Sequence, residues 1–155
     1  MNFYVLTLIH LLATIIWVGG MFFAHQCLRP AALATLEPPH RLTLWRAVFG
    51  RFFPWVWGCV ITLILTGQFL VAGMGSMATV PVQIHIMATI GYLMTVIFAF
   101  IFFMPYAALK KAVASQDWPA GAAALNRIRV LIGVNLVLGI LNVSAIFLMP
   151  VLMHA

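Results

Sequence analysis

The chain has 155 residues, of which 65% are hydrophobic and only 6% are charged. This composition excludes a water-soluble domain and predicts an integral membrane protein. The formal net charge of +6 does not call for a nucleic acid partner, because the anionic headgroups of a lipid bilayer facing basic loops account for it.

Four apolar runs without charged residues occupy residues 3–25, 52–73, 81–105 and 130–150. Each run is close to the ~20 residues that a helix needs to cross a bilayer. The runs are too long and too uniformly apolar to be the alternating strands of a β-barrel. We therefore expect an all-α integral membrane protein, a four-transmembrane-helix bundle in which residues 1–155 form a single membrane domain.

The connection between the first two runs, residues 31–51, is predicted to lie on the membrane surface. The Pro38-Pro39 pair interrupts regular structure in this segment, and arginines then alternate with apolar residues. Three large apolar side chains recur there at helical spacing: Leu42, Trp45 and Phe49. Such a pattern is typical of a short interfacial helix. In the later connection, Asp117-Trp118-Pro119 predicts a helix start, followed by an alanine-rich turn that leads to the last run.

The basic residues predict the orientation of the chain. They all lie in two connections: Arg29, Arg41, Arg46, Arg51, Lys110, Lys111, Arg127 and Arg129. The N-terminus, the loop at 74–80 and the C-terminal tail carry none of them. The positive-inside rule then places both basic connections in the cytoplasm. We expect a multi-pass protein of the bacterial inner membrane with both termini in the periplasm.

An internal repeat relates the two halves. The segments Ile9–Ile15 and Ile84–Ile90 share five of seven residues, including a histidine, at an offset of 75 (85 − 10 = 75). The same offset aligns one proline and one glycine of each half, Pro30 with Pro105 and Gly58 with Gly133. Each half contains one inward and one outward helix, so the copies would have the same orientation. We expect two parallel two-helix repeats, about 1–75 and 76–155.

The repeated histidines, His10 and His85, are the candidate ligands. At ~1.5 Å per residue they lie roughly 10 Å and 6 Å below the outer surface. A histidine inside a membrane is costly without a partner, although a hydrogen bond to a neighbouring helix would also satisfy it. The duplication favours a ligand role, whereas His25 and His40 are expected to be incidental. Four further residues are candidates for the same cofactor site: Trp17, Tyr92, Gln83 and Asn142.

Neutral imidazole suits haem iron and copper. Two facing histidines could supply both axial ligands of a b-type haem, which favours an electron-transfer protein with a quinone or a periplasmic redox partner. The absence of Lys and Arg from the outer side, where haem propionates would need a cation, counts against haem. The copper alternative uses the same histidines and the soft ligands of the outer side: Met74, Met77, Met149, Met153 and His154. The sequence has no paired carboxylates, phosphate loop or nucleophile–base pair, which excludes a hydrolase but leaves an oxidoreductase and a homo-oligomer open.

The segment His10–Phe23, followed by Leu28-Arg29-Pro30, resembles the first helix of the bacterial CopD-like (copper resistance protein D) membrane family. Arg51–Trp55 and Arg127–Gly139 extend the resemblance. It implies copper handling, commonly copper uptake across the inner membrane. The chain is more distantly similar to HemJ, a b-haem-containing protoporphyrinogen oxidase type, through His10 and the exit of the first helix, but the third helix lacks the lysine of that family. We expect a b-type haem protein, with a CopD-type copper protein as the alternative.

Overall fold

The computed structural model describes residues 2–153, including their side chains except those of residues 147 and 150–153. Within this part the chain is helical throughout apart from short turns. Its elements are α1 (Phe3–Phe22), the π-helical turn η1 (Phe23–Leu28), α2 (Arg29–Thr35), α3 (Pro38–Gly73), α4 (Val82–Phe103), α5 (Pro105–Ala114) and α6 (Trp118–Met153). Four helical stretches are long and apolar enough to cross a membrane. The predicted all-α, four-helix membrane bundle is confirmed.

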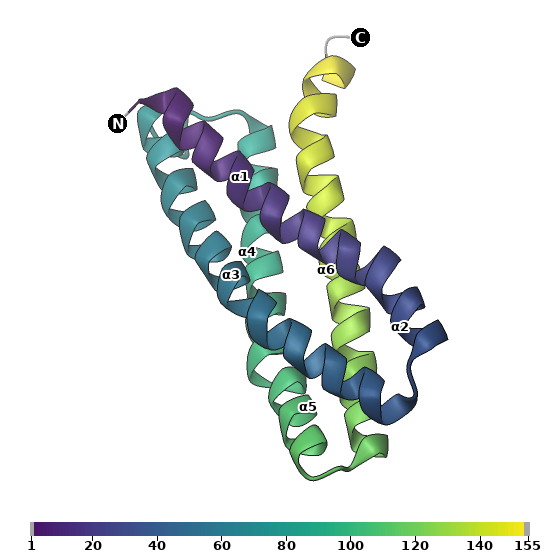
Figure 1. Ribbon diagram of the computed structural model, residues 1–155. Coiled ribbons are helices and arrows are strands. Elements are labelled where there is room, and N and C mark those ends of the chain that lie inside the picture. The colour runs from purple at the N-terminus through teal and green to yellow at the C-terminus, as the bar shows by residue number, and fades with distance from the viewer. Residues whose placement is uncertain (1, 154–155) are drawn as a thin grey trace.

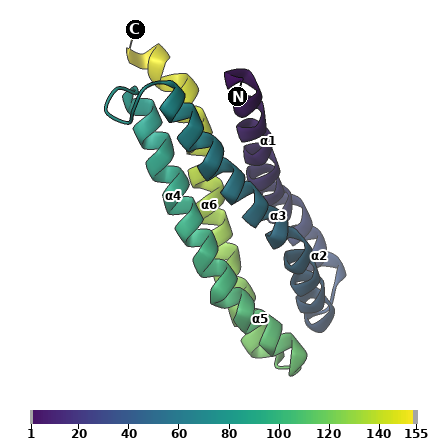
Figure 2. The ribbon, with the colours of Figure 1, turned by 90° about the vertical axis from the view of Figure 1, so that its left-hand side faces the viewer.

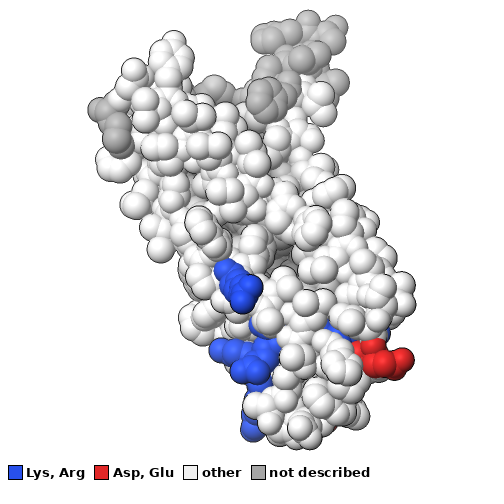
Figure 3. Space-filling model, viewed as in Figure 1, with Lys and Arg blue, Asp and Glu red and all other residues white. Residues whose placement is uncertain are grey.

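The helices run along one another with the turns gathered at two ends (Figures 1 and 2). The N-terminus, the α3–α4 turn and the last turns of α6 lie at one end, which we call the terminal end. The α2–α3 and α5–α6 turns lie at the opposite end, toward which lysine and arginine gather in Figure 3. We call it the basic end. The most extensive packing joins α1 to α3 and α4 to α6, so each half of the chain is a helical hairpin.

The segment predicted to lie on the membrane surface belongs to the core instead. Residues 38–73 form one uninterrupted helix, α3, which includes Leu42, Trp45 and Phe49. All three side chains are almost completely buried. The prediction of an interfacial helix was wrong because apolar residues at helical spacing serve equally well to pack against neighbouring helices.

The last helix begins earlier than the apolar pattern indicated. The predicted start at Asp117 is confirmed, since its side chain accepts a hydrogen bond from the backbone N–H of Ala120 at 3.1 Å. The alanine-rich stretch that follows is helical rather than a turn. Alanine is the strongest helix former, and helix packing covers this stretch from one side. The consequence is that α6, like α3, extends far beyond its apolar run.

The core of the bundle is an aromatic cluster near the basic end. Phe49 stacks on Phe53 with ring centroids 5.0 Å apart, and Tyr106 meets Phe53 edge-on at 4.9 Å. Trp45 lies on the other side of Phe49 at 5.0 Å. Aromatic pairs in these geometries add stabilisation beyond the area that they bury. The cluster thus joins α3 to α5 and fixes the basic half of the bundle.

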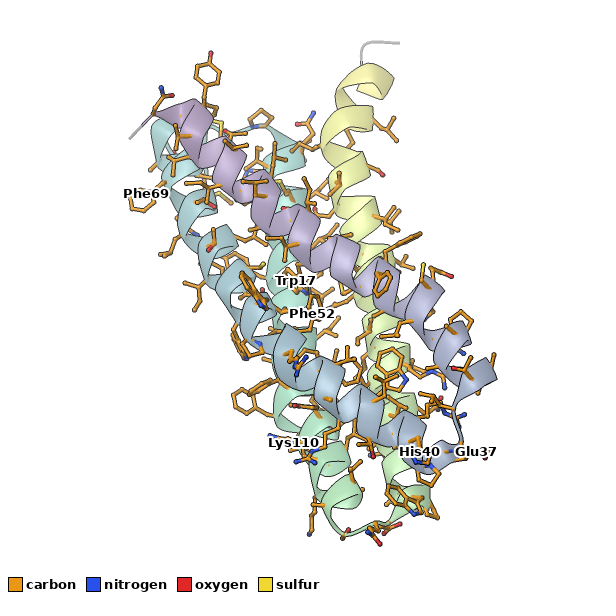
Figure 4. All side chains as sticks on the ribbon, viewed as in Figure 1. Trp17, Glu37, His40, Phe52, Phe69 and Lys110 are labelled. Atoms are coloured by element: carbon orange, nitrogen blue, oxygen red, sulfur yellow. The ribbon has the colours of Figure 1, made fainter. Side chains whose placement is uncertain are left out.

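Small residues allow the helices to approach in the middle of the bundle. A Cβ atom at Gly20 would overlap the ring of Phe52, and one at Gly139 would meet Val18 and Met94. Figure 4 shows Trp17 and Phe52 together where α1 passes α3. Small residues at contacts are the usual means of close helix packing in membranes.

The two helical stretches that lead from the terminal end to the basic end both change geometry near their last turns. In the first, hydrogen bonding switches to the wider π pattern at η1, just before Pro30 in α2. In the second, α4 ends at Phe103 and α5 begins at Pro105. Proline lacks the backbone N–H and interrupts a continuing helix. Pro30 and Pro105 are the prolines that the 75-residue offset aligns.

Candidate functional site

His10 is held on α1 by one hydrogen bond to α3. Its Nδ1 lies 2.8 Å from the Oγ1 of Thr66. The Thr66 hydroxyl in turn donates to the backbone carbonyl of Thr62 at 2.6 Å. Since that hydroxyl has a single proton, its oxygen accepts from His10, and the imidazole carries its proton on Nδ1. The lone pair of Nε2 is therefore free.

The imidazole lies beside a glycine on α3. A Cβ atom at Gly67 would lie 3.6 Å from the Cε1 of His10, so the ring lies against the helix backbone there. Nε2 forms no hydrogen bond with the described residues. A histidine whose one nitrogen donates to a fixed oxygen, leaving the other nitrogen as a lone pair, is the usual arrangement of a metal ligand. This tautomer leaves the Nε2 of His10 available as a ligand, and metal binding at His10 stays a prediction.

His85 has a different environment from its repeat partner. Its side chain is exposed on α4. The recorded hydrogen bond at this residue uses its backbone carbonyl, which accepts from the Thr89 hydroxyl at 2.8 Å. The contacts of His10 lie on α3, not on α4. Joint ligation of one group by His10 and His85 stays a prediction.

The other residues predicted for a cofactor site each have different described partners. Trp17 is buried in the core, edge-on to Phe98 at 6.2 Å. Tyr92 is exposed, and its hydroxyl oxygen accepts from the Gln68 amide at 2.7 Å. Asn142 donates from α6 to the carbonyl of Met87 at 3.3 Å. Gln83 is half-buried in the first turn of α4. Their common membership of one site stays a prediction.

The predicted soft ligands lie at the terminal end as far as the structure describes them. Met74 and Met77 are exposed in the α3–α4 turn, and Met149 is half-buried near the end of α6. The side chain of Met153 and the whole of His154 lie outside the described residues. Among the described residues, no three His, Cys, Asp or Glu side chains form a cluster that could hold a metal ion. A metal here would depend on methionine thioethers as well as imidazole.

Two residues of the structure were not anticipated from the sequence. Thr66, the partner of His10, is one of several threonines in apolar runs, and nothing in its local pattern distinguishes it. His25, expected to be incidental, is half-buried in η1, and its Nδ1 is buried without a hydrogen-bond partner. Its Nε2 lies 3.2 Å from where a Cβ atom at Gly133 would be. The glycine of α6 was the signal that could have located this contact.

These observations define a class: a polytopic membrane protein whose candidate metal ligands lie toward the end opposite its basic residues. The model of the family described as copper resistance protein D (CopD) matches residues 46–149. This match spans about two-thirds of the chain, and the chain belongs to the CopD family. No curated protein and no solved structure matches it. The matched segment contains His85, Met74, Met77 and Met149, whereas His10 precedes it.

Proposed function

We propose that this protein binds copper within the membrane and handles it as cargo, with His10 as the principal ligand. The observation that supports this most directly is the Thr66 hydrogen bond, which leaves the Nε2 lone pair of His10 available. Membership of the copper resistance family supports copper as the metal. Imidazole combined with thioether is a soft ligand set that suits Cu(I).

Copper would enter at the terminal end, where exposed soft ligands precede the deeper imidazole. Met74 and Met77 lie in the α3–α4 turn, and the exposed imidazole of His85 follows on the first turns of α4. His10 lies seven residues into α1, roughly 10 Å from the start of that helix along its axis. We infer that the methionines and His85 collect the ion and that His10 holds it. Met149, Met153 and His154 are the further candidates on α6.

The same arrangement supports an orientation. The basic end faces the cytoplasm by the positive-inside rule, which places the terminal end and both termini in the periplasm of a bacterial inner membrane. Copper would then be collected from the periplasmic side. The lipid bilayer is the one partner that the four spans require, and a periplasmic copper donor fits the exposed methionines.

The haem interpretation has less support than the copper alternative. It requires two imidazoles to face one ring, whereas the described contacts of His10 lie on α3 and His85 is exposed. The family match points to copper. A b-type haem with a quinone partner therefore serves as the competing outcome of the experiment below.

The decisive experiment measures Cu(I) binding to the purified full chain by anaerobic competition with a chromogenic chelator. We expect His10→Ala to weaken binding by at least tenfold. Thr66→Val should weaken it by about tenfold, because groups that orient a ligand typically contribute 10–100-fold. Thr66→Ser, which keeps the hydroxyl, should restore most of the affinity.

His40→Ala is the matched control, since His40 is an exposed histidine at the basic end and should leave the affinity unchanged. Unchanged Cu(I) affinity in His10→Ala would contradict the proposal. A Soret band in the same preparation that is lost in His10→Ala and in His85→Ala would show that the bound group is haem and not copper.

A further inference from the structure

Three arginines from three helical segments line one cavity at the basic end. Arg29 begins α2, Arg41 lies in the first turns of α3, and Arg129 is on α6. The cavity has a volume of about 80 Å³. Because about 10–15 Å³ suffices for one water, this cavity has room for a polyatomic group. All three arginines are half-buried, so their charges are only partly hydrated.

The positive charge of this cavity has no counterion within the described residues. The whole sequence has only two acidic residues, Glu37 and Asp117, and no carboxylate of the described chain pairs with any of the three arginines. Arg41 donates one weak hydrogen bond to the carbonyl of Leu36 at 3.4 Å. Arg129 has its Nε buried without a partner.

A second observation points to a ligand in the same place. His25 and Arg129 line a small recess that adjoins the cavity, and both carry a buried nitrogen without a hydrogen-bond partner. Buried polar nitrogens in native proteins are nearly always hydrogen-bonded. Holding three like charges together without a counterion is unfavourable. An anion in the cavity would neutralise the arginines and accept hydrogen bonds from the free donors.

The depth of the cavity indicates what kind of anion it meets. Arg29 follows Phe3, the first residue of α1, by 26 residues (29 − 3), which corresponds to about 39 Å of helix. The hydrocarbon core is about 30 Å thick and the bilayer with its headgroups about 40–45 Å. With the start of α1 at the headgroups of one leaflet, this length brings Arg29 to the level of the lipid phosphates of the other.

The walls of the cavity also suit a lipid. Leu33 is exposed beside it, and Leu42, Trp45 and Leu125 form its buried side. Arginine matches a phosphate with two parallel hydrogen bonds. Basic pockets between transmembrane helices on the cytoplasmic side are typical binding sites of acidic lipid headgroups. We propose that the Arg29, Arg41 and Arg129 cavity binds a phosphate group, that of an anionic phospholipid of the surrounding membrane.

The test uses native mass spectrometry of the full chain released from micelles that contain phosphatidylglycerol or phosphatidylcholine. We expect the parent protein to retain phosphatidylglycerol in preference to phosphatidylcholine. Arg129→Gln should weaken retention by about tenfold, the effect of losing one strong charged hydrogen bond. Arg129→Lys keeps the charge but not the paired hydrogen bonds, so its lipid retention should lie between that of the parent and that of Arg129→Gln.

Arg127→Gln is the matched control. It removes the same charge, but Arg127 is an exposed arginine on the same helix outside the cavity. If Arg129→Gln does not fold, as judged by helicity and size-exclusion behaviour, Arg41→Gln tests the same cavity. Inorganic phosphate that binds the parent and displaces the lipid, but does not bind Arg129→Gln, supports the phosphate site and assigns it to a soluble source. Equal lipid retention by the parent, Arg129→Gln and Arg127→Gln overturns the proposal.

Discussion

The basic and terminal halves of the bundle differ in how they are held together. In α3 every buried apolar residue lies between Leu42 and Val60, and beyond them only Thr66 is buried. In α4 the buried residues begin at Met94, past the middle of the helix. The basic half therefore has a packed core, whereas the terminal half holds the candidate ligands in a looser arrangement.

The length of the helices explains this difference. α3 has 36 residues, which correspond to about 54 Å and exceed the ~30 Å of the hydrocarbon layer. Part of the bundle must emerge from the lipid, and the charges place that part at the basic end. Water drives apolar side chains together, whereas lipid provides no such driving force between helices. Leu42, Trp45 and Phe49 precede the apolar run that begins at residue 52, so this part of the core belongs to the length of α3 that exceeds the hydrocarbon thickness.

The largest expected effect comes from removing a ring of this core. Phe49 is 1% exposed and contacts three other rings, so Phe49→Ala should lower the free energy of unfolding by about 3–5 kcal/mol. Phe69 is 57% exposed in the terminal half of the same helix and points away from the bundle (Figure 4). Phe69→Ala should change the free energy of unfolding by less than about 0.5 kcal/mol. Denaturation in mixed micelles measures both, and equal effects would refute the division into two halves.

Two adjacent glycines at the boundary provide an intermediate effect. A Cβ atom at Gly20 would overlap Phe52, whereas one at Gly19 would meet nothing within 4 Å. Gly20→Ala should therefore destabilise by about 1–3 kcal/mol, and Gly19→Ala should be tolerated. Phe52→Ala in the Gly20→Ala background should recover part of the loss. Thermal unfolding of the four proteins checks this, and the absence of recovery would argue against a direct clash.

The smallest effect is expected for a hydrogen bond from α6 to α4 that occurs once in each half of the bundle. Asn135 and Asn142 lie seven residues apart on α6 and donate to the carbonyls of Met94 and Met87, also seven residues apart on α4. Asn135 is 1% exposed and its bond is 3.1 Å, against 3.3 Å for the half-buried Asn142. Asn135→Ala should cost about 1 kcal/mol and Asn142→Ala about half of that. A larger loss at Asn142 in chemical denaturation would mean that the terminal half is the better packed one.

The spans could be predicted from the sequence because hydropathy alone determines them. The four apolar runs correspond to the four helical spans, and the motif of Asp117 predicted the start of α6. The ends of the helices could not be predicted in this way. Leu42, Trp45 and Phe49 carry a pattern that an interfacial helix and a packed helix share, and only the position of neighbouring helices distinguishes the two.

The candidate site was predicted in part. His10 was identified from its motif, and the structure gives it an oriented imidazole. The repeat favoured a ligand role for His85 as well, but a similar local sequence does not fix which helix packs on it. Thr66 lies 56 residues from His10, and such long-range partners depend on tertiary packing. The three arginines were used only to assign orientation, because their convergence on one cavity depends on the same packing.

The π-helical turn η1 at Phe23–Leu28 determines how the side chains that follow it are rotated about the helix axis. A π-helical turn takes up one more residue per hydrogen-bonded ring than an α-helical turn. If these six residues were α-helical, each later side chain would be rotated about the axis by about 100°. Arg29, which comes directly after the turn, would then be turned out of the cavity that it shares with Arg129. The π-helical turn thus sets the rotation of the residues that follow it. The same helical stretch can therefore direct His10 toward α3 near one membrane surface and the Arg29 guanidinium toward α6 near the other.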